Sequence, residues 1–419
     1  MRNIIRGVIA SVACLALGVV SMSGAAGGSP PTTITPVSAP TSLAGFTAIA
    51  CWSVGNCVAG GVSIATSHSG ATSHTVPIVA TQVDGSWAPA VSMAALSSTE
   101  PSTVTGIACP AASQCVAVVI RITLSTKGRA PTYASYLVSQ TASGWAAPQR
   151  VPVVASAHQG VQIEAIQCPV VGSCELLGMS RNSSTSGSMF VMSWRDGAFS
   201  RAHVFTVGSL GKGALDAEVL SLSCPSLGSC VVVGRYTTLS PSIRFEPFTI
   251  SQVAGTWHSP QRRGAYQAAS RNNSLESVSC PSPGNCVAVG ASENRLTASA
   301  PGELVMTETS GVWGAARLLA HAPGGATLRA VSCVSPGNCT ALMTMGFGVS
   351  YGTNAGEVSE TGGHWAPPSG APSSGYSQLE LIALACVSPF ACTAAGDATP
   401  LKTVGRVPVV AASDSGVWQ

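Results

Sequence analysis

The stretch SVSCPSPGNCVAVG, residues 277–290, places Cys280 and Cys286 on either side of five residues that are rich in turn formers. An alternating β-rich segment precedes the first cysteine, and an apolar run follows the second. This pattern predicts two antiparallel strands joined by a tight turn. Residues 224–234, CPSLGSCVVVG, repeat it closely, so the strand pair is one copy of a recurring unit.

Seven such units follow one another along the chain. Their first cysteines are 58, 59, 56, 56, 53 and 53 residues apart, and the units begin near residues 45, 103, 162, 218, 274, 327 and 380. Each unit also carries an aromatic residue just after a glycine turn, as in Gly85-Ser-Trp87 and Gly311-Val-Trp313. The cysteine pairs are Cys51 with Cys57, Cys109 with Cys115, Cys168 with Cys174, Cys224 with Cys230, Cys280 with Cys286, Cys333 with Cys339, and Cys386 with Cys392.

The pattern of each unit indicates a meander of four antiparallel strands, and no unit shows a helical period. Four-stranded units repeated every 53–59 residues are typical of the blades of a β-propeller. Immunoglobulin-like sandwiches need about 100 residues per domain, and solenoid rungs are much shorter than this unit. We therefore expect an all-β, seven-bladed propeller over residues 27–419. Residues 31–39 are predicted to complete the last blade and close the ring.

The string SVSCPSPGNCVAVG, with its following strand, Gly-x-Trp turn and strand, resembles the BNR or Asp-box propellers of the sialidase-like superfamily. It is most similar to a cysteine-paired version found in secreted actinobacterial proteins. The family's box is Ser-x-Asp-x-Gly-x-x-Trp, whereas here the Gly-to-Trp spacing is shorter and the aspartate is mostly missing. Asp414, in SDSGVW, comes closest to it. The box is structural in that family, so the resemblance implies the fold and leaves the activity open.

The cysteine pairs are interpreted as disulfides that join the first two strands of each unit. Closing a loop of about seven residues contributes roughly 2 kcal/mol in the chain-entropy model. A zinc site needs four ligands together, and no histidine recurs beside the pairs. A redox dithiol usually has two intervening residues, and seven copies of one would be unusual. We expect no metal and no cofactor.

The N-terminus is typical of a secretory signal, with Arg2 and Arg6 before an apolar core and then small residues. We expect residues 1–26 to be that signal; an uncleaved anchor is the alternative. Only 9% of the residues are charged, and the net charge is +3. This balance argues against nucleic acid or an anionic membrane as the main partner. We expect a secreted or envelope-associated monomer with no membrane insertion after cleavage.

Function is expected on the ring face that carries the second-to-third and fourth-to-first strand connections, because these vary most between units. We call this the loop face, and the opposite face, with the cysteine and Gly-x-Trp turns, the turn face. Surface ion pairs of little energetic value are the alternative interpretation of the charged residues on the loop face. Lys212, Asp216 and Glu218 lie between the third and fourth units. The main candidate binding residues are Arg244, Glu246, Arg262, Arg263, Tyr266, Arg271 and Glu276.

No coherent catalytic set is visible in the sequence. Gly348-Val-Ser350-Tyr-Gly352 matches a nucleophile-elbow pattern, but that pattern works on a strand-to-helix turn, and here it lies in a glycine-rich loop of an all-β repeat. We therefore expect a non-catalytic binding or scaffold protein that recognises a glycan or an envelope protein. The alternative is a glycoside hydrolase or lyase whose paired carboxylates come from separate blades.

Overall fold

The computed structural model describes residues 34–418 apart from short segments at 42, 67–72, 94–95, 97–99, 125–129, 155–158, 182–186, 240–242, 265–271, 295–298, 320–325, 346–353, 372–374, 390, 403–404 and 415–416. The expected signal at residues 1–26 lies outside this part. The described residues are mostly strands, with one short 3-10 helix, η2 (Val207–Leu210). None of their helices is long and apolar enough to cross a membrane.

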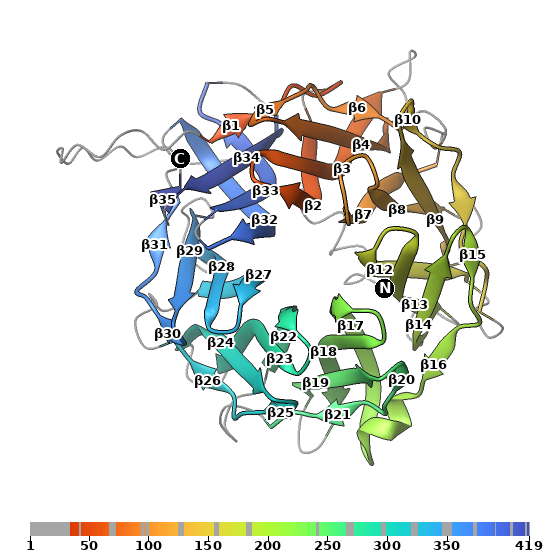
Figure 1. The fold of residues 1–419 in the computed structure, drawn as a ribbon, viewed down its shortest axis with the longest axis vertical. Helices are drawn as coiled ribbons and strands as arrows, with labels where there is room; N and C mark the ends of the chain where they lie inside the picture. Colours follow the sequence, from red (N-terminus) through yellow and green to blue (C-terminus); the bar gives the residue numbers. More distant parts are fainter. Residues whose placement is uncertain are drawn as a thin grey trace.

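The strands form a ring of radially arranged sheets, as Figure 1 shows, and the all-β propeller fold is thereby confirmed. The first strand of each repeat lies innermost, and these strands contact one another in an unbroken cycle around the centre. They are β2 (Ala44–Ser53), β7 (Ser102–Ala108), β12 (Val161–Val170), β17 (Ala214–Ser226), β22 (Asn272–Ser282), β27 (Ala326–Ser335) and β32 (Tyr376–Ser388).

The second and third strands make up the body of each sheet, and their apolar side chains pack between neighbouring sheets. Val58 and Val79, for example, pack in one cluster with Val104 of the next sheet. The second strands are β3 (Asn56–Thr66), β8 (Val116–Thr123), β13 (Ser173–Arg181), β18 (Ser229–Thr238), β23 (Asn285–Asn294), β28 (Asn338–Met345) and β33 (Ala391–Pro400). The third strands are β4 (Ser73–Val83), β9 (Thr132–Thr141), β14 (Gly187–Arg195), β19 (Arg244–Val253), β24 (Ser299–Thr309), β29 (Asn354–Thr361) and β34 (Val407–Asp414).

The predicted fourth strand is interrupted, and only two short pieces of it pair with the third strand. Prolines such as Pro89, Pro148 and Pro260 fall between the pieces in several repeats, where they cannot donate a ladder hydrogen bond. The pieces are β5 (Ser86–Trp87), β6 (Val91–Ser92), β10 (Gly144–Trp145), β11 (Gln149–Arg150), β15 (Ala198–Phe199), β16 (His203–Phe205), β20 (Thr256–Trp257), β21 (Gln261–Arg262), β25 (Val312–Trp313), β26 (Arg317–Leu318), β30 (His364–Trp365), β31 (Ser369–Gly370) and β35 (Val417–Trp418).

The sheets do not match the seven predicted blades one for one. Five sheets are separate and five-stranded, whereas the strands of the fourth and fifth repeats form one ten-stranded sheet. They are joined by a single parallel pairing, between Phe245 of β19 and Asn272 of β22. This pairing lies at the loop end of the two strands, near the start of each. Isolated bridges occur between other repeats, at Leu43–Arg406 and Tyr133–Gly160.

The N-terminal strand β1 (Thr35–Pro36) lies on the outer side of the last sheet. It pairs antiparallel with β34, where Thr35 is opposite Val410. The amide of Val37 donates to the carbonyl of Pro408 at 2.9 Å, and the Val37 side chain is buried. Residues at the two ends of the described chain therefore share one sheet, while residues 31–33 lie outside the description.

The two glycine turns of a repeat contact each other on the turn face. In the first repeat the amide of Gly85 donates to the carbonyl of Gly55 at 2.8 Å, and the same bond recurs between Gly311 and Gly284. The Gly-x-Trp hairpin has two consecutive residues with positive φ, such as Asp84 and Gly85, as a type I′ turn requires. The equivalent bond is present in the first, third, fourth, fifth and sixth repeats, so the turn face is nearly the same in these five.

All seven predicted cysteine pairs form disulfides, with Cα atoms 4.0–4.1 Å apart. Each disulfide joins the innermost strand of its repeat to the start of the second strand, as predicted. The bonds link Cys51 to Cys57, Cys109 to Cys115, Cys168 to Cys174, Cys224 to Cys230, Cys280 to Cys286, Cys333 to Cys339, and Cys386 to Cys392.

The disulfides lie beside the turns of the turn face, and several of their cysteines are buried. The second cysteine in each of the first four repeats is at most 1% exposed. Its side chain belongs to the apolar cluster between two neighbouring sheets, because it occupies a core-facing position of the second strand. These sulfurs are therefore buried cross-links and not part of an accessible site. The four residues are Cys57, Cys115, Cys174 and Cys230.

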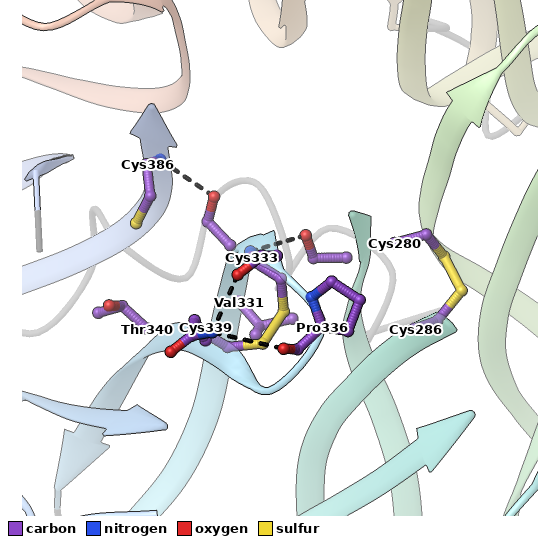
Figure 2. The surroundings of a disulfide bond; sticks show 12 residues. Cys280, Cys286, Val331, Cys333, Pro336, Cys339, Thr340 and Cys386 are labelled. Atoms are coloured by element: carbon purple, nitrogen blue, oxygen red, sulfur yellow. Dashed lines mark hydrogen bonds between the residues drawn. A yellow bond between two sulfur atoms is a disulfide. The ribbon is translucent and has the colours of Figure 1, made fainter. Parts of the chain in front are cut away.

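Beside three of the disulfides, a serine hydroxyl links one repeat to the next. The amide of Cys280 donates to Ser223 Oγ at 2.9 Å, and the amide of Cys386 donates to Ser332 Oγ at 3.0 Å. Figure 2 shows the second of these links beside the Cys333–Cys339 disulfide. At these three places a covalent bond within a repeat therefore lies beside a hydrogen bond between repeats.

Removing the buried hydroxyl in Ser223→Ala should leave the amide of Cys280 without a partner. We expect the free energy of unfolding to fall by about 1–3 kcal/mol, measured by denaturant unfolding with the disulfides intact. Ser92→Ala, at an exposed position of β6, is the control and should change it little. Equal effects of the two substitutions would contradict the assigned role of Ser223.

Ala254 has a φ of 48° at the turn position where Asp84 and Asp196 occur in other repeats. Because asparagine tolerates this conformation better than alanine, Ala254→Asn should raise the free energy of unfolding by about 1 kcal/mol. At the equivalent position of the first repeat, Asp84→Ala should lower the free energy of unfolding, because alanine replaces a residue that tolerates this conformation better. Thermal unfolding of both variants tests the expectation, which fails if they shift in the same direction.

Candidate functional site

The predicted loop-face candidates are spread over several strands. Arg244 and Glu246 lie in β19, Arg262 lies in β21 with Arg263 directly after it, and Glu276 lies in β22. Tyr266 and Arg271 lie outside the described residues. The described candidates do not gather into one site, and the alternation of side chains along a strand explains part of this.

The side chains of Arg262 and Arg263 lie on opposite sides of their sheet. The Nε atom of Arg262 donates to the carbonyl of Leu210 in η2, and its guanidinium lies 5.4 Å from the centre of the Tyr236 ring. The guanidinium of Arg263 instead lies 5.6 Å from the centre of the Trp313 ring in the fifth repeat. The two arginines therefore help to pack different neighbours and do not form a shared binding surface.

Glu246 is also engaged in packing. The hydroxyl of Tyr236, which is fully buried, donates to Glu246 Oε2 at 2.5 Å. Burial, together with this hydrogen bond and the charge of Glu246, raises the pKa of Tyr236 above its usual range. Glu246 thus satisfies a buried hydroxyl between the third and fourth repeats.

Glu276 belongs to a feature that recurs in every repeat, a β-bulge in the innermost strand. One residue of that strand is left out of the pairing with the second strand, always four positions before the first cysteine. Bulges at a sheet edge re-aim side chains, often next to functional sites. The bulged residues are Thr47, Thr105, Glu164, Leu220, Glu276, Arg329 and Ile382.

The bulged Glu164 belongs to a set of charged residues contributed by the third and fourth repeats. Arg181 ends β13, beside β12, and both strands belong to the third repeat. From the fourth repeat, β17 contributes two acids and β18 contributes an arginine. We call this set the carboxylate–arginine cluster, and it consists of Glu164, Arg181, Asp216, Glu218 and Arg235.

The electrostatics of this cluster couple the two repeats. Burial raises the pKa of Glu164 to about 7; the charge of Arg181 opposes that shift and the charge of Glu218 adds to it. Burial also raises the pKa of Asp216. Glu218 is paired with Arg235, whose Nη2 atom lies 2.7 Å from its Oε2. A carboxyl with a pKa near neutrality can exchange a proton at physiological pH, and the neighbouring ion pair supplies polar contacts for a ligand.

Sequence reasoning identified Asp216 and Glu218 of this cluster but missed the other three members. Glu164 occupies the position four residues before the first cysteine of its repeat, and aligning the repeats on their cysteines identifies the equivalent position in each of them. Arg181 and Arg235 stand at different offsets after their cysteines, so the repeat pattern gave no reason to place them together. Among the described residues, no group of three or more metal-binding side chains is arranged to hold a metal ion. Residues 348–352 lie outside the description.

No protein-family model matches the chain, and no curated protein matches its sequence. Its fold resembles several solved structures. A puromycin hydrolase aligns with a TM-score of 0.53 at 12% identity, covering 91% of this chain and 53% of its own, so the chain spans about half the length of that enzyme. The β-propeller domain of the Trilobed protease from Pyrococcus furiosus aligns with a TM-score of 0.50 at 7% identity, covering 90% and 97%. An ulvan lyase of family PL25 gives 0.51 at 8% identity, covering 90% and 97%.

Stability should depend on pH through Glu164. Its pKa in the folded protein, about 7, lies above the ordinary 4.5, so between these values the folded chain binds more protons than the unfolded chain and stability falls as pH rises. Glu164→Gln lacks this contribution, and its free energy of unfolding relative to the wild type should rise across this range. Denaturant unfolding at several pH values measures the difference, and parallel curves for the two proteins would contradict the shift.

Proposed function

We propose that the protein is a secreted, non-catalytic propeller that binds a glycan at the carboxylate–arginine cluster on its loop face. The observation that supports this proposal is the concentration of charge. In a chain with only 9% charged residues, five ionisable side chains from the first two strands of two neighbouring repeats interact electrostatically, and Glu218 and Arg235 form an ion pair among them. Sugar hydroxyls both donate to carboxylates and accept from guanidinium groups, so a polyhydroxylated ligand suits this set.

The proposal includes the finer interpretation of the fold. The ten-stranded sheet counts as two blades joined by the Phe245–Asn272 pairing, which makes a ring of seven. Seven disulfides are typical of an oxidising compartment such as the cell exterior. The likeness to Asp-box propellers is part of the same proposal and concerns the fold alone.

A second candidate function is glycoside hydrolysis or elimination with Glu164 as the proton donor or acceptor. One specific observation favours it, namely that Glu164 has a pKa of about 7 next to the ion-paired Glu218. Pairs of carboxyl groups whose environments differ in this way serve as acid and base in many glycosidases. The ulvan lyase and puromycin hydrolase folds are compatible with either function, because their likeness extends to the fold only.

Binding is tested with the purified protein on an array of envelope and plant polysaccharides. We expect Glu218→Gln to weaken retention of the bound glycan by about tenfold or more, because hydrogen bonds to charged groups are worth about 1.5–3 kcal/mol. Glu100→Gln removes the acid of another ion pair, with Arg121, and should leave binding unchanged. The proposal is overturned if no glycan is retained, or if the two variants lose retention equally. If the protein captures an envelope protein and no glycan, its ligand is a protein and the glycan proposal is wrong.

Catalysis is tested on the same glycan by following new reducing ends and the ultraviolet absorbance of unsaturated products. If the protein is non-catalytic, neither signal grows with time. If turnover occurs, Glu164→Gln should abolish it and Glu100→Gln should leave it unchanged, and the second candidate would then be favoured over the first.

A further inference from the structure

Three exposed leucines occupy the same position in three different repeats. Each stands nine residues after the second cysteine of its repeat and directly follows the second strand, at the end of that strand on the loop face. They are Leu124 after β8, Leu239 after β18 and Leu401 after β33, and they are 60%, 54% and 65% exposed. Single exposed leucines are common on protein surfaces, but their recurrence at one position of the repeat makes a pattern.

These leucines lie at one level around the ring, because equivalent positions of a repeat lie at equivalent heights of the propeller. The strands that they follow, β8, β18 and β33, belong to three different sheets that are spread around the ring, as Figure 1 shows. The repeats concerned are the second, fourth and seventh, so one or two repeats separate each leucine from the next. Three apolar side chains at one level around a ring are suited to a flat partner that lies across the loop face.

In the fourth repeat, two more aliphatic residues lie at the loop ends of the neighbouring strands. These strand ends are in register, because Ala214 of β17 pairs with Thr238 of β18, and Thr238 pairs with Arg244 of β19. Leu215 directly follows the first of these three residues, and Ile243 directly precedes the last. Leu215 is 54% exposed and Ile243 is 61% exposed. This strand edge therefore presents several large aliphatic side chains to solvent, which is typical of an interaction surface.

Both lysines that the structure describes occur close to these leucines in the sequence. Lys402 directly follows Leu401, and Lys212 stands three residues before Leu215. Both lysines are exposed and lie on the loop face. A lysine can lay its aliphatic stem along an apolar surface and keep its ammonium group among polar groups. The leucines and lysines together thus give the loop face an apolar and cationic character.

We propose that the loop face rests on the surface of a lipid bilayer, with the three leucines in its interfacial layer and the lysines at anionic headgroups. A flat surface contacts all three leucine positions at once, whereas a small ligand reaches only one of them. Aliphatic side chains bind by burial at the interface, and lysines bind by attraction to anionic lipids. Because the net charge is only +3, we expect the leucines to supply most of the affinity, unlike the charge-driven membrane binding that the sequence argued against.

The test is sedimentation of the full protein with vesicles of phosphatidylcholine and phosphatidylglycerol. We expect the protein to bind these vesicles, and to bind vesicles of phosphatidylcholine alone more weakly. Leu124→Ser, Leu239→Ser and Leu401→Ser should each weaken binding about tenfold, because each removes one aliphatic side chain from the interface. The three variants should melt at the wild-type temperature, since these side chains are exposed in the folded protein.

Leu227→Ser is the matched control, because Leu227 belongs to the same repeat as Leu239 and is 51% exposed, but lies on the turn face. It should leave vesicle binding unchanged. The proposal is overturned if the protein does not bind the vesicles, if the three loop-face variants bind as the wild type does, or if Leu227→Ser weakens binding equally. Dimerisation through these leucines without vesicle binding would also overturn it, and would assign the surface to a second copy of the chain. The vesicles contain no carbohydrate, so the outcome is independent of the glycan proposal.

Discussion

The ring depends on how each innermost strand meets the next sheet, because no further strand covers its inner edge. Three junctions use serine hydroxyls that accept a backbone amide of the following cysteine, as Ser279 does for Cys333 at 2.9 Å. At two earlier junctions the side chain is the donor instead of the acceptor, because the hydroxyls of Thr47 and Thr105 donate to backbone carbonyls of the next sheet. Neutral side chains thus satisfy backbone groups between sheets, which fits a chain with so few charges.

The disulfides act within a repeat, whereas these hydroxyl links act between repeats. The two kinds of contact meet at the same place, because Ser223, Ser279 and Ser332 each precede the first cysteine of their repeat. A cysteine fixed to its own second strand presents its amide to the neighbouring sheet in a reproducible position. We infer that the clipped hairpin stabilises the ring partly by holding the donor of the next link in place.

The regular parts of this fold could be predicted from the sequence, and the irregular parts could not. The spacing of the cysteines predicted the strand pairs, the turn face and the propeller class, because each follows from local pattern repeated in register. The joining of two repeats into one sheet rests on a single pairing at Asn272, which has no sequence signal. Adjacency in sequence misled at Arg262 and Arg263, because neighbouring residues of a strand point to opposite faces. The cluster at Glu164 required the packing of two repeats to bring distant residues together.

In a repeat protein, the residues that depart from the repeat are the most informative about function. The bulge position is threonine in two repeats and leucine or isoleucine in two others, so the charge of Glu164 there is not needed for the fold. The position opposite the turn aromatic is glutamine at Gln82, Gln140 and Gln252, so the carboxylates of Glu308 and Glu360 are likewise not needed for it. Burying an acid where a neutral residue suffices is unfavourable unless something else interacts with it. Glu164 lies towards the loop face, whereas Glu308 and Glu360 stand opposite cysteines near the turn face, so departures from the repeat occur at both ends of the sheets.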